Sequence, residues 1–370
     1  MRFAVQKRQK GVALIVVLML VALVAVIGTE MASRLQLHVT RATNIKDNNQ
    51  AYWYAMGAEQ FAKKSIIELL ERNNNVVSLE GGWSDEFTFP LEGGGIQAQL
   101  MDMQTCFNLN AINAANVNND AGNNAQAGQR NRNDSNNTNN NDNGENAQQN
   151  TPQPAPRQAS PDGAPPAEAE AFERLLTEAI PELDSYAKEV VRDSLIDWLD
   201  EDDELTQSGA EDADYGALVN PYLAANGLMV SKSELRLVNG VQPQWINALM
   251  PLVCVIPTVS QLKININTVK EEQAPVLAAL TGVPLSDIQS LIGNREPSGY
   301  ENVQDFLSES LFSNYPLSDV QRQWFDIKTE YFLLHTKTRY NNASFAMSSL
   351  LKVENDDTVT VIRREFGGIR

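Results

Sequence analysis

Hydrophobic residues follow one helical pattern over the first fifth of the chain. The eighteen residues from Val12 to Thr29 include no charged side chain, and leucine, valine and isoleucine dominate. In a helix such a run rises about 27 Å, close to the roughly 30 Å thickness of a bilayer core. The helical pattern continues without proline to Arg72, and Asn73–Asn75 then predicts its end. We therefore predict one helix over 12–72 that first crosses a membrane and then lies on a sheet.

Alternating hydrophobic and polar positions predict strands in two separate parts of the chain. The first part is 76–113, with a turn predicted at Gly93–Gly95. The second is 321–370, with turns predicted at Asn341–Asn342 and at Glu354–Asp357. Strands this far apart in sequence can still share one sheet that covers the second half of the long helix.

A low-complexity segment and a helical block separate the two strand regions. Residues 114–168 are rich in asparagine and then in proline and alanine, with Val117 as their one large aliphatic residue. Such a segment buries too little apolar surface to offset its chain entropy, so we predict a disordered insert. Helical spacing returns over 169–320. The predicted fold class is α+β, a long N-terminal helix packed on an antiparallel sheet, with a large inserted α-helical domain.

The charge of the chain bears on its partners. Its 47 acidic and 29 basic residues give a net charge of −18, whereas phosphate binding needs lysine and arginine. Residues 263–310 resemble a helix-hairpin-helix module, familiar from DNA-binding proteins, yet they hold three basic and seven acidic residues. We therefore predict no nucleic acid partner and interpret this stretch as a structural helical domain.

Acidic residues crowd into one part of the helical block. No lysine or arginine occurs between Asp193 and Ser231, and nine carboxylates fall within 197–214. Calcium takes six to eight oxygen ligands in flexible geometry, so this segment is either a calcium-binding loop or a solvated acidic surface. The candidate ligands are Asp200, Asp202, Glu211, Asp212 and Asp214, with Asn226 less favoured.

The rarer residue types point to structure rather than to catalysis. The two cysteines, Cys106 and Cys254, lack the spacing of a zinc site, and in an oxidising compartment we expect them to pair; two buried free thiols are the alternative. The two histidines, His38 and His335, have no catalytic triad context, so no catalytic residue and no enzyme activity are predicted. Trp53 and its tyrosine neighbours are interpreted as core between helix and sheet.

The N-terminal segment has three interpretations. A cleaved signal peptide would have a shorter apolar region, although Ala32 and Ser33 could mimic its cleavage site. A simple anchor would keep the basic residues before the apolar run in the cytoplasm and the remainder outside. The basic leader ending in Gly11 also resembles the type III leader of the type IV pilin superfamily. In that superfamily a prepilin peptidase cuts after the glycine and the new N-terminus, here Val12, is methylated. Most members carry glutamate at the fifth mature position, which here is Val16.

Nearly the whole chain, apart from the asparagine-rich insert, resembles the minor pseudopilin K family of bacterial type II secretion systems. The resemblance rests on the Gly11 leader without glutamate and on four motifs, "CFNLNAI" at 106–112, "LIDWLDEDDELTQSGAEDADY" at 195–215, "NPYLAANGLMVSKSELRLVNG" at 220–240 and "ININT" at 264–268. Together with the patterns above, it gives a division into a prepilin leader (1–11), a transmembrane helix (12–30), its amphipathic continuation (31–75), pilin-like strands (76–113), the insert (114–168), a helical domain (169–320) and C-terminal strands (321–370).

The resemblance also implies a function. Family members form a tip complex with minor pseudopilins I and J, start or cap the periplasmic pseudopilus and support export of folded proteins. We expect the prepilin peptidase and inner-membrane lipid as further partners, with the C-terminal domain in the periplasm and the other pseudopilins contacting the buried side of the first helix. Calcium sites occur in this block of the family, which favours a structural Ca²⁺ here. The alternative function is a minor pilin of a type IV pilus with an adhesive or DNA-uptake role.

Overall fold

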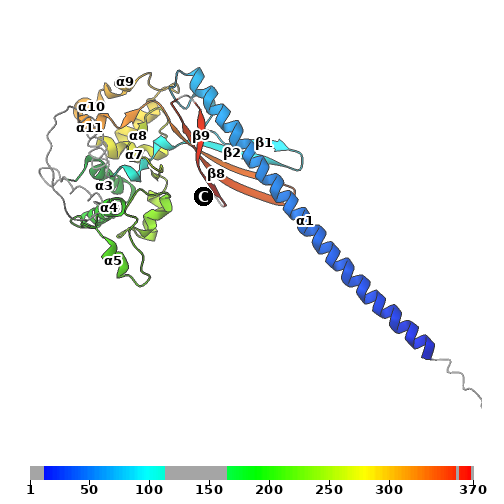
Figure 1. Cartoon of the computed structure of the whole chain (residues 1–370). Coiled ribbons are helices and arrows are strands. Elements are labelled where there is room, and N and C mark those ends of the chain that lie inside the picture. The colour runs from blue at the N-terminus through cyan, green and yellow to red at the C-terminus, as the bar shows by residue number, and fades with distance from the viewer. Residues whose placement is uncertain (1–11, 113–164, 356–357, 368–370) are drawn as a thin grey trace, which may run out of the picture.

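The computed structural model describes residues 12–112, 165–355 and 358–367. The first element is α1, which runs from Val12 to Arg72 as one continuous helix and confirms the predicted bounds. Figure 1 shows its N-terminal half projecting away from the rest of the chain. It ends at the predicted asparagine run, because Asn74 and Asn75 take left-handed backbone conformations with φ of 49° and 65°.

An antiparallel sheet of five strands packs against the C-terminal half of α1 (Figure 1). In spatial order, its strands are β1 (Phe87–Leu91), β2 (Gly94–Asp102), β7 (Tyr331–Tyr340), β8 (Ala343–Val353) and β9 (Val359–Phe366). The predicted turn at Asn341–Asn342 joins β7 to β8. Strands from both ends of the sequence thus form one sheet, as predicted.

Alanine dominates the contact between α1 and the sheet. The buried positions of the helix follow helical spacing and lie on one face: Asp47, Ala51, Ala55, Ala58, Glu59, Ala62, Ile66 and Leu70. Small side chains let the helix backbone approach the strands, and the Thr338 hydroxyl donates to the Ala51 carbonyl oxygen at 2.7 Å. The buried Glu59 carboxylate accepts from the Arg364 guanidinium at 2.7 and 2.8 Å and from the Ser349 hydroxyl at 2.7 Å.

A helical domain, here called the head, is inserted between β2 and β7. Its main helices are α3 (Ala167–Ala179), α4 (Ser185–Leu199), α5 (Asp212–Gly216), α6 (Pro243–Leu249), α7 (Ala274–Thr281), α8 (Leu285–Asn294), α9 (Val303–Leu307), α10 (Leu311–Asn314) and α11 (Asp319–Arg322). The short 3₁₀ helices η2 (Met103–Thr105) and η3 (Leu109–Ala111) precede α3, whereas η4 (Lys232–Leu237) and η5 (Glu271–Gln273) lie between the main helices. Another, η1 (Glu80–Gly82), precedes β1.

Two short parallel strand pairs shift the borders of the head. Strand β3 (Phe107–Asn108) pairs with β4 (Val253–Cys254), and β5 (Ile264–Asn265) pairs with β6 (Phe325–Asp326). Residues 107–112 were expected among the pilin-like strands, but Phe107, Leu109 and Ile112 lie in the core of the head. Helix α3 begins at Ala167, inside the range assigned to the insert, whose residues 114–164 lie outside the described residues.

Candidate functional site

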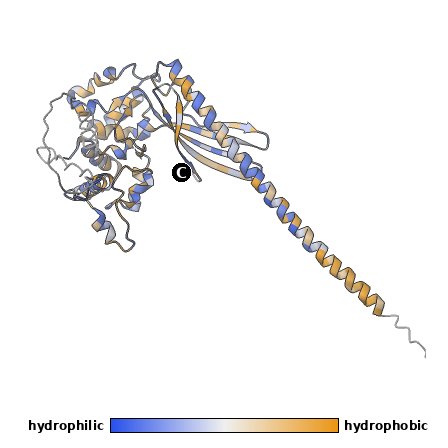
Figure 2. Ribbon diagram, viewed as in Figure 1, coloured by the Kyte–Doolittle hydropathy of each residue, from blue (hydrophilic) through white to orange (hydrophobic). Residues whose placement is uncertain are grey.

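The candidate membrane anchor is the N-terminal part of α1. Among the described residues, α1 is the one helix long and apolar enough to cross a membrane. Figure 2 shows that its hydrophobic residues dominate the half that projects away from the sheet. Val12 is the first residue of the helix, while Gly11 lies outside the described residues. The predicted cleavage would thus leave a mature chain that starts with the helix itself.

The face of α1 expected to contact partners is already occupied. Its buried alanines pack on the chain's own sheet, so the expectation that other subunits contact the buried side is wrong for the part of α1 that the sheet covers. Trp53 is a second correction, because it is 64% exposed rather than part of the core. Tyr52 and Tyr54 are half-buried and pack on Phe345 and Tyr340 of the sheet.

The acidic segment folds as a loop between α4 and α5. Two carboxylates on the last turns of α4 hold it, since Asp197 accepts from the Thr206 backbone N–H and Asp193 accepts from that of Ser208. The loop passes so close to α4 that a Cβ atom at Gly209 would lie 1.8 Å from the Asp197 carboxylate. A side chain at position 209 would therefore displace the Asp197 carboxylate from its place beside the loop.

The predicted calcium ligands occupy different positions in this loop. Asp202, Asp212 and Asp214 each accept from a backbone N–H, of Glu204, Ala224 and Glu211 respectively. Asp200 and Glu211 are buried, with 8% and 3% of their surface exposed. The buried Oδ1 atom of Asn226 has no hydrogen-bond partner among the described residues.

These positions supply only oxygen donors, which suit calcium. Within the described part of the chain, however, no three acidic, histidine or cysteine side chains come together closely enough to hold a metal ion. An ion in this loop would need carbonyl or amide oxygens as ligands, in addition to carboxylates such as those of Asp200 and Glu211.

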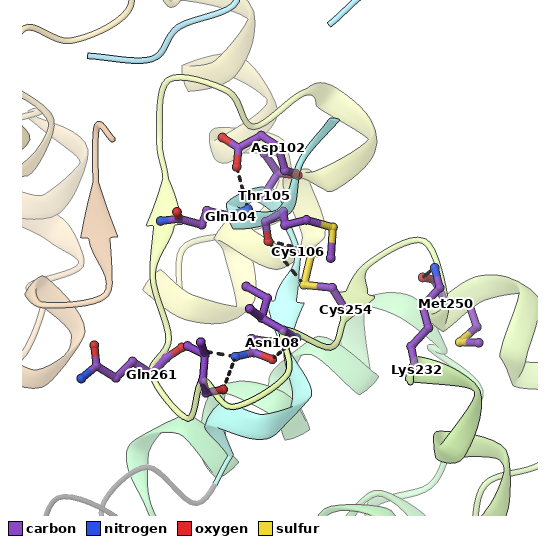
Figure 3. The surroundings of a disulfide bond; sticks show 12 residues. Asp102, Gln104, Thr105, Cys106, Asn108, Lys232, Met250, Cys254 and Gln261 are labelled. Carbon is purple, nitrogen blue, oxygen red and sulfur yellow. Dashed lines mark hydrogen bonds between the residues drawn. A yellow bond between two sulfur atoms is a disulfide. The ribbon is translucent and has the colours of Figure 1, made fainter. Parts of the chain in front are cut away.

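A disulfide joins the start of the head to its middle. Cys106 and Cys254 are 148 residues apart in sequence, and their Cα atoms are 5.7 Å apart (Figure 3). Cys254 lies in β4, and Cys106 directly precedes β3, the strand that pairs with β4. The bond therefore fixes the point at which the chain passes from the pilin-like sheet into the head.

Two asparagines of the "CFNLNAI" motif hold distant loops by hydrogen bonds to the backbone. Asn108 donates to the carbonyl oxygen of Val259 at 2.8 Å and accepts from the Ile256 N–H (Figure 3). Asn110 donates to the carbonyl of Met229 at 3.0 Å and accepts from the N–H of the same residue. Both side chains are buried. Each therefore supplies the hydrogen bonds that water would otherwise make to backbone groups outside helices and strands.

A buried polar cluster, here called the joint, connects the sheet to the head. The Asp102 carboxylate at the end of β2 accepts from the hydroxyls of Thr268 and Thr329, both at 2.5 Å, and from the Gln104 N–H at 2.7 Å. Burial raises the pKa of Asp102 to about 6, against the lowering effect of these hydrogen bonds.

Asn265, of the "ININT" motif, extends the joint. It donates to the Val77 carbonyl at 3.0 Å and to the Thr329 hydroxyl at 2.8 Å. The motifs that carry the family resemblance thus supply the structural polar contacts of the head. The sequence analysis did not predict this structural role of the motif asparagines. Their position among apolar residues was a signal that they are buried and hydrogen-bonded.

The histidines have different surroundings. His38 is exposed on α1, whereas His335 on β7 shares a 3.0 Å hydrogen bond with Ser348 on β8. Burial lowers the pKa of His335. Ser348 pairs with His335 on one neighbouring strand and with Glu365 on the other, so it lies between them. Glu365 is therefore not positioned to orient the imidazole of His335. This order differs from a catalytic triad, in which histidine is central.

Comparison with known proteins gives the family. A family profile described as "Type II secretion system (T2SS), protein K" matches residues 105–258 and a second matches residues 264–328. The type II secretion system protein K of Aeromonas hydrophila is 30% identical over 98% of each chain. That of Dickeya chrysanthemi is 34% identical, again over 98% of each chain.

The chain belongs to the type II secretion system protein K family. The fold agrees with this assignment. A solved structure described as the GspK-GspI-GspJ complex from the type 2 secretion system of enterotoxigenic Escherichia coli contains a similar chain. The likeness covers 89% of this chain and 99% of that one, with a TM-score of 0.68 and 26% identity. A pilin-like helix and sheet carrying a helical insert is therefore the fold of this protein K family member.

Proposed function

We propose that this chain is a minor pseudopilin that forms the tip of the type II secretion pseudopilus. It assembles with minor pseudopilins I and J, starts or caps the fibre, and supports export of folded proteins across the outer membrane. Family membership and the similar chain in the three-protein complex support this proposal. The anchor lies in the inner membrane, and the sheet and head lie in the periplasm.

The observation that carries the tip position is the place of the head. It is inserted between β2 and β7, beside the end of α1 that lies away from the anchor (Figure 1). Subunits within a fibre shaft have neighbours on all sides of their globular part. The head, as a second domain with its own core, would obstruct the packing of neighbouring subunits in the shaft. At the end of a fibre no subunit follows, so the head has room there.

Immunogold labelling of overproduced fibres tests the tip position. Antibodies against the head should label one end of each fibre, whereas antibodies against the major pseudopilin should label the whole length. Labelling by the head antibody all along the fibres would contradict the tip position. If all three minor pseudopilins are present in the membrane and no complex of this chain with the other two can be purified, the partner assignment fails.

Processing at the N-terminus is part of the same proposal. The prepilin peptidase cuts between Gly11 and Val12, and the mature chain begins with a methylated Val12. Intact-mass analysis of the membrane form tests this, because a chain that starts at Met1 or beyond Ala32 would contradict it. Gly11→Val should leave the precursor uncut and abolish secretion.

Calcium is the cofactor we propose for the acidic loop, where it would neutralise buried carboxylates and stabilise the head. The purified chain should gain thermal stability with calcium and lose it in chelator, because a ligand that binds only the folded state stabilises it by mass action. Asp200→Ala and Glu211→Ala should reduce the calcium response. Asp203→Ala, which removes an exposed carboxylate of the same loop, should not. An unchanged melting curve in chelator, with no metal in elemental analysis, would identify the loop as a solvated surface.

A further inference from the structure

A groove with a volume of about 290 Å³ lies beside the disulfide, at the border between the head and the sheet. Its floor includes the side chains of Gln104 and Asn108, which lie two residues before and two residues after Cys106 (Figure 3). One wall is the segment 258–261 of the head, and the other is the segment 328–331, which leads into β7. Segments of both parts of the molecule therefore line the groove.

Two amide side chains hold the walls of the groove in place. Gln104 accepts from the Glu330 N–H at 2.6 Å and donates to the Lys328 carbonyl oxygen at 3.4 Å. Asn108 holds the other wall, since it donates to the Val259 carbonyl oxygen at 2.8 Å. Both amides are buried and hydrogen-bonded, so they fix the shape of the groove and are not free to bind a ligand.

A strained turn begins the wall formed by 258–261. Pro257 and Thr258 are its central residues, and the Val259 N–H donates to the Ile256 carbonyl oxygen at 3.3 Å. Thr258 has a φ of 64°, a conformation that is an outlier for a β-branched residue and that glycine usually occupies in such a turn. Strained residues of this kind cluster at ligand-binding sites. The strain therefore points to the wall that follows the turn.

The chain after this turn leaves its backbone donors unpaired. From Ser260 to Lys263 no backbone N–H donates to another residue within the described part of the chain. The next N–H, that of Ile264 at the start of β5, donates to the Trp324 carbonyl oxygen at 2.7 Å. Consecutive unpaired N–H groups ahead of a strand form an edge to which an extended peptide can add.

The side chains of the groove narrow the class of ligand. Lys328 and Glu330 lie on the same wall, so a polyanion, which needs cations without nearby carboxylates, is disfavoured. Small-molecule sites are lined mostly by apolar and aromatic side chains. Here the apolar and aromatic lining residues are Ile256, Val259 and Tyr331, and the others are polar or charged. A ligand with many carbonyl oxygens and little net charge fits these walls.

We propose that this groove binds an extended peptide segment of another protein through main-chain hydrogen bonds to Ser260–Lys263. The hydroxyl of Thr258 and the opposite charges of Lys328 and Glu330 then contact its side chains. A bound segment contacts the head through one wall and the chain leading to β7 through the other, so it stabilises their arrangement. The tip position is not needed for this contact, since a segment of any protein with an unpaired backbone fits it.

The test uses the full chain in detergent and two arrays of capped peptides of about ten residues, long enough to form one added strand. One array covers the sequences of the other pseudopilins and the second covers the exported proteins, so the two sources are distinguished. Retained peptides are then measured in solution by fluorescence anisotropy. We expect at least one to bind and to raise the melting temperature of the chain. If no peptide of either array binds, the groove is not a peptide site.

Variants of one wall residue locate the binding. Ser260→Tyr fills the groove with a ring and should weaken a bound peptide about tenfold or more. Ser344→Tyr adds the same ring at an exposed position of β8 outside the groove and should leave the affinity unchanged. Equal affinities of the two tyrosine variants would overturn the proposal.

The main-chain contacts have a test of their own. Ser260→Pro removes one backbone N–H and should weaken the peptide complex about fivefold, the effect of one lost hydrogen bond. Thermal unfolding without peptide checks that each variant is folded. If Ser260→Pro is folded and binds the peptide as tightly as the unaltered chain, the Ser260 N–H makes no contact and the proposed binding mode is wrong.

Discussion

The pilin-like part and the head achieve a stable core by different means. In the pilin-like part, one long helix lays its alanine face on a regular sheet, and the buried Glu59 forms an ion pair with the partly exposed Arg364. In the head, short helices and two-residue strands supply few backbone ladders. Side chains such as Asn108, Asn110 and Asn265 pair further backbone groups, and one disulfide crosslinks the domain. Regular elements satisfy their own backbone, whereas a domain of loops depends on particular polar side chains.

The largest expected effect is loss of the disulfide in the head. Cys106→Ser with Cys254→Ser should destabilise the head by about 3–5 kcal/mol, because a crosslink that closes a long loop restricts the unfolded chain. Hydrogen exchange should report faster opening of α3 and α7 than of β7 and β8. Thiol labelling of the unfolded, unreduced protein should find no free thiol. Two reactive thiols would show that Cys106 and Cys254 are not paired and would contradict the prediction.

The next effect concerns the ion pair under α1. Arg364→Ala should cost about 3 kcal/mol, because it leaves the fully buried Glu59 carboxylate without its cation. Glu59→Ala should cost less, since the remaining Arg364 is 36% exposed and can be hydrated. Urea unfolding of the two single variants and the double variant measures this difference. Equal losses in the two single variants would contradict the assigned asymmetry.

Sequence patterns were sufficient for the pilin-like part. The apolar run that begins at Val12, the buried face of the C-terminal half of α1 and the alternation of β7 are local patterns, so Val12, Arg72 and the turn at Asn341–Asn342 could be predicted. The head could be predicted only as helical. Its asparagine contacts join residues more than a hundred positions apart, and no local period records such a pair.

The same limit applies to the candidate sites. The density of acidic residues in the sequence identified the loop. How the loop folds back on α4 then decides which carboxylates are buried, Asp200 and Glu211, and which accept from backbone N–H groups, Asp202, Asp212 and Asp214. Trp53 shows the converse error, because an aromatic residue among helix residues was taken for core and is exposed.

A smaller effect should follow from removal of one asparagine contact. Asn110→Ala should cost about 2 kcal/mol, because the Met229 N–H and carbonyl would stay buried without their partner. Asn48→Ala is a suitable control, since that side chain is exposed and bonds only within α1. Thermal unfolding of both variants tests the contrast. An Asn110→Ala chain as stable as the control would show that the motif asparagines do not hold the head.

The smallest expected effect lies at the joint between the two parts and depends on pH. The pKa of Asp102 is about 6 in the folded chain, above its ordinary value, so its contribution to stability is present at low pH and is lost as pH rises through 6. Between pH 7.5 and pH 5 the free energy of unfolding should therefore rise by about 1 kcal/mol from this group.

The pKa of Glu59 shifts the other way: burial would raise it, but the hydrogen bonds from Arg364 and Ser349 lower it. The stability from Glu59 is therefore lost only below this pH range. Asp102→Asn should remove the Asp102 contribution from the slope while keeping the side chain's shape, and urea unfolding at the two pH values measures it. If the free energy of unfolding changes equally with pH in the variant and in the unaltered chain, Asp102 does not titrate in this range. Packing and neutral hydrogen bonds would then connect the sheet to the head.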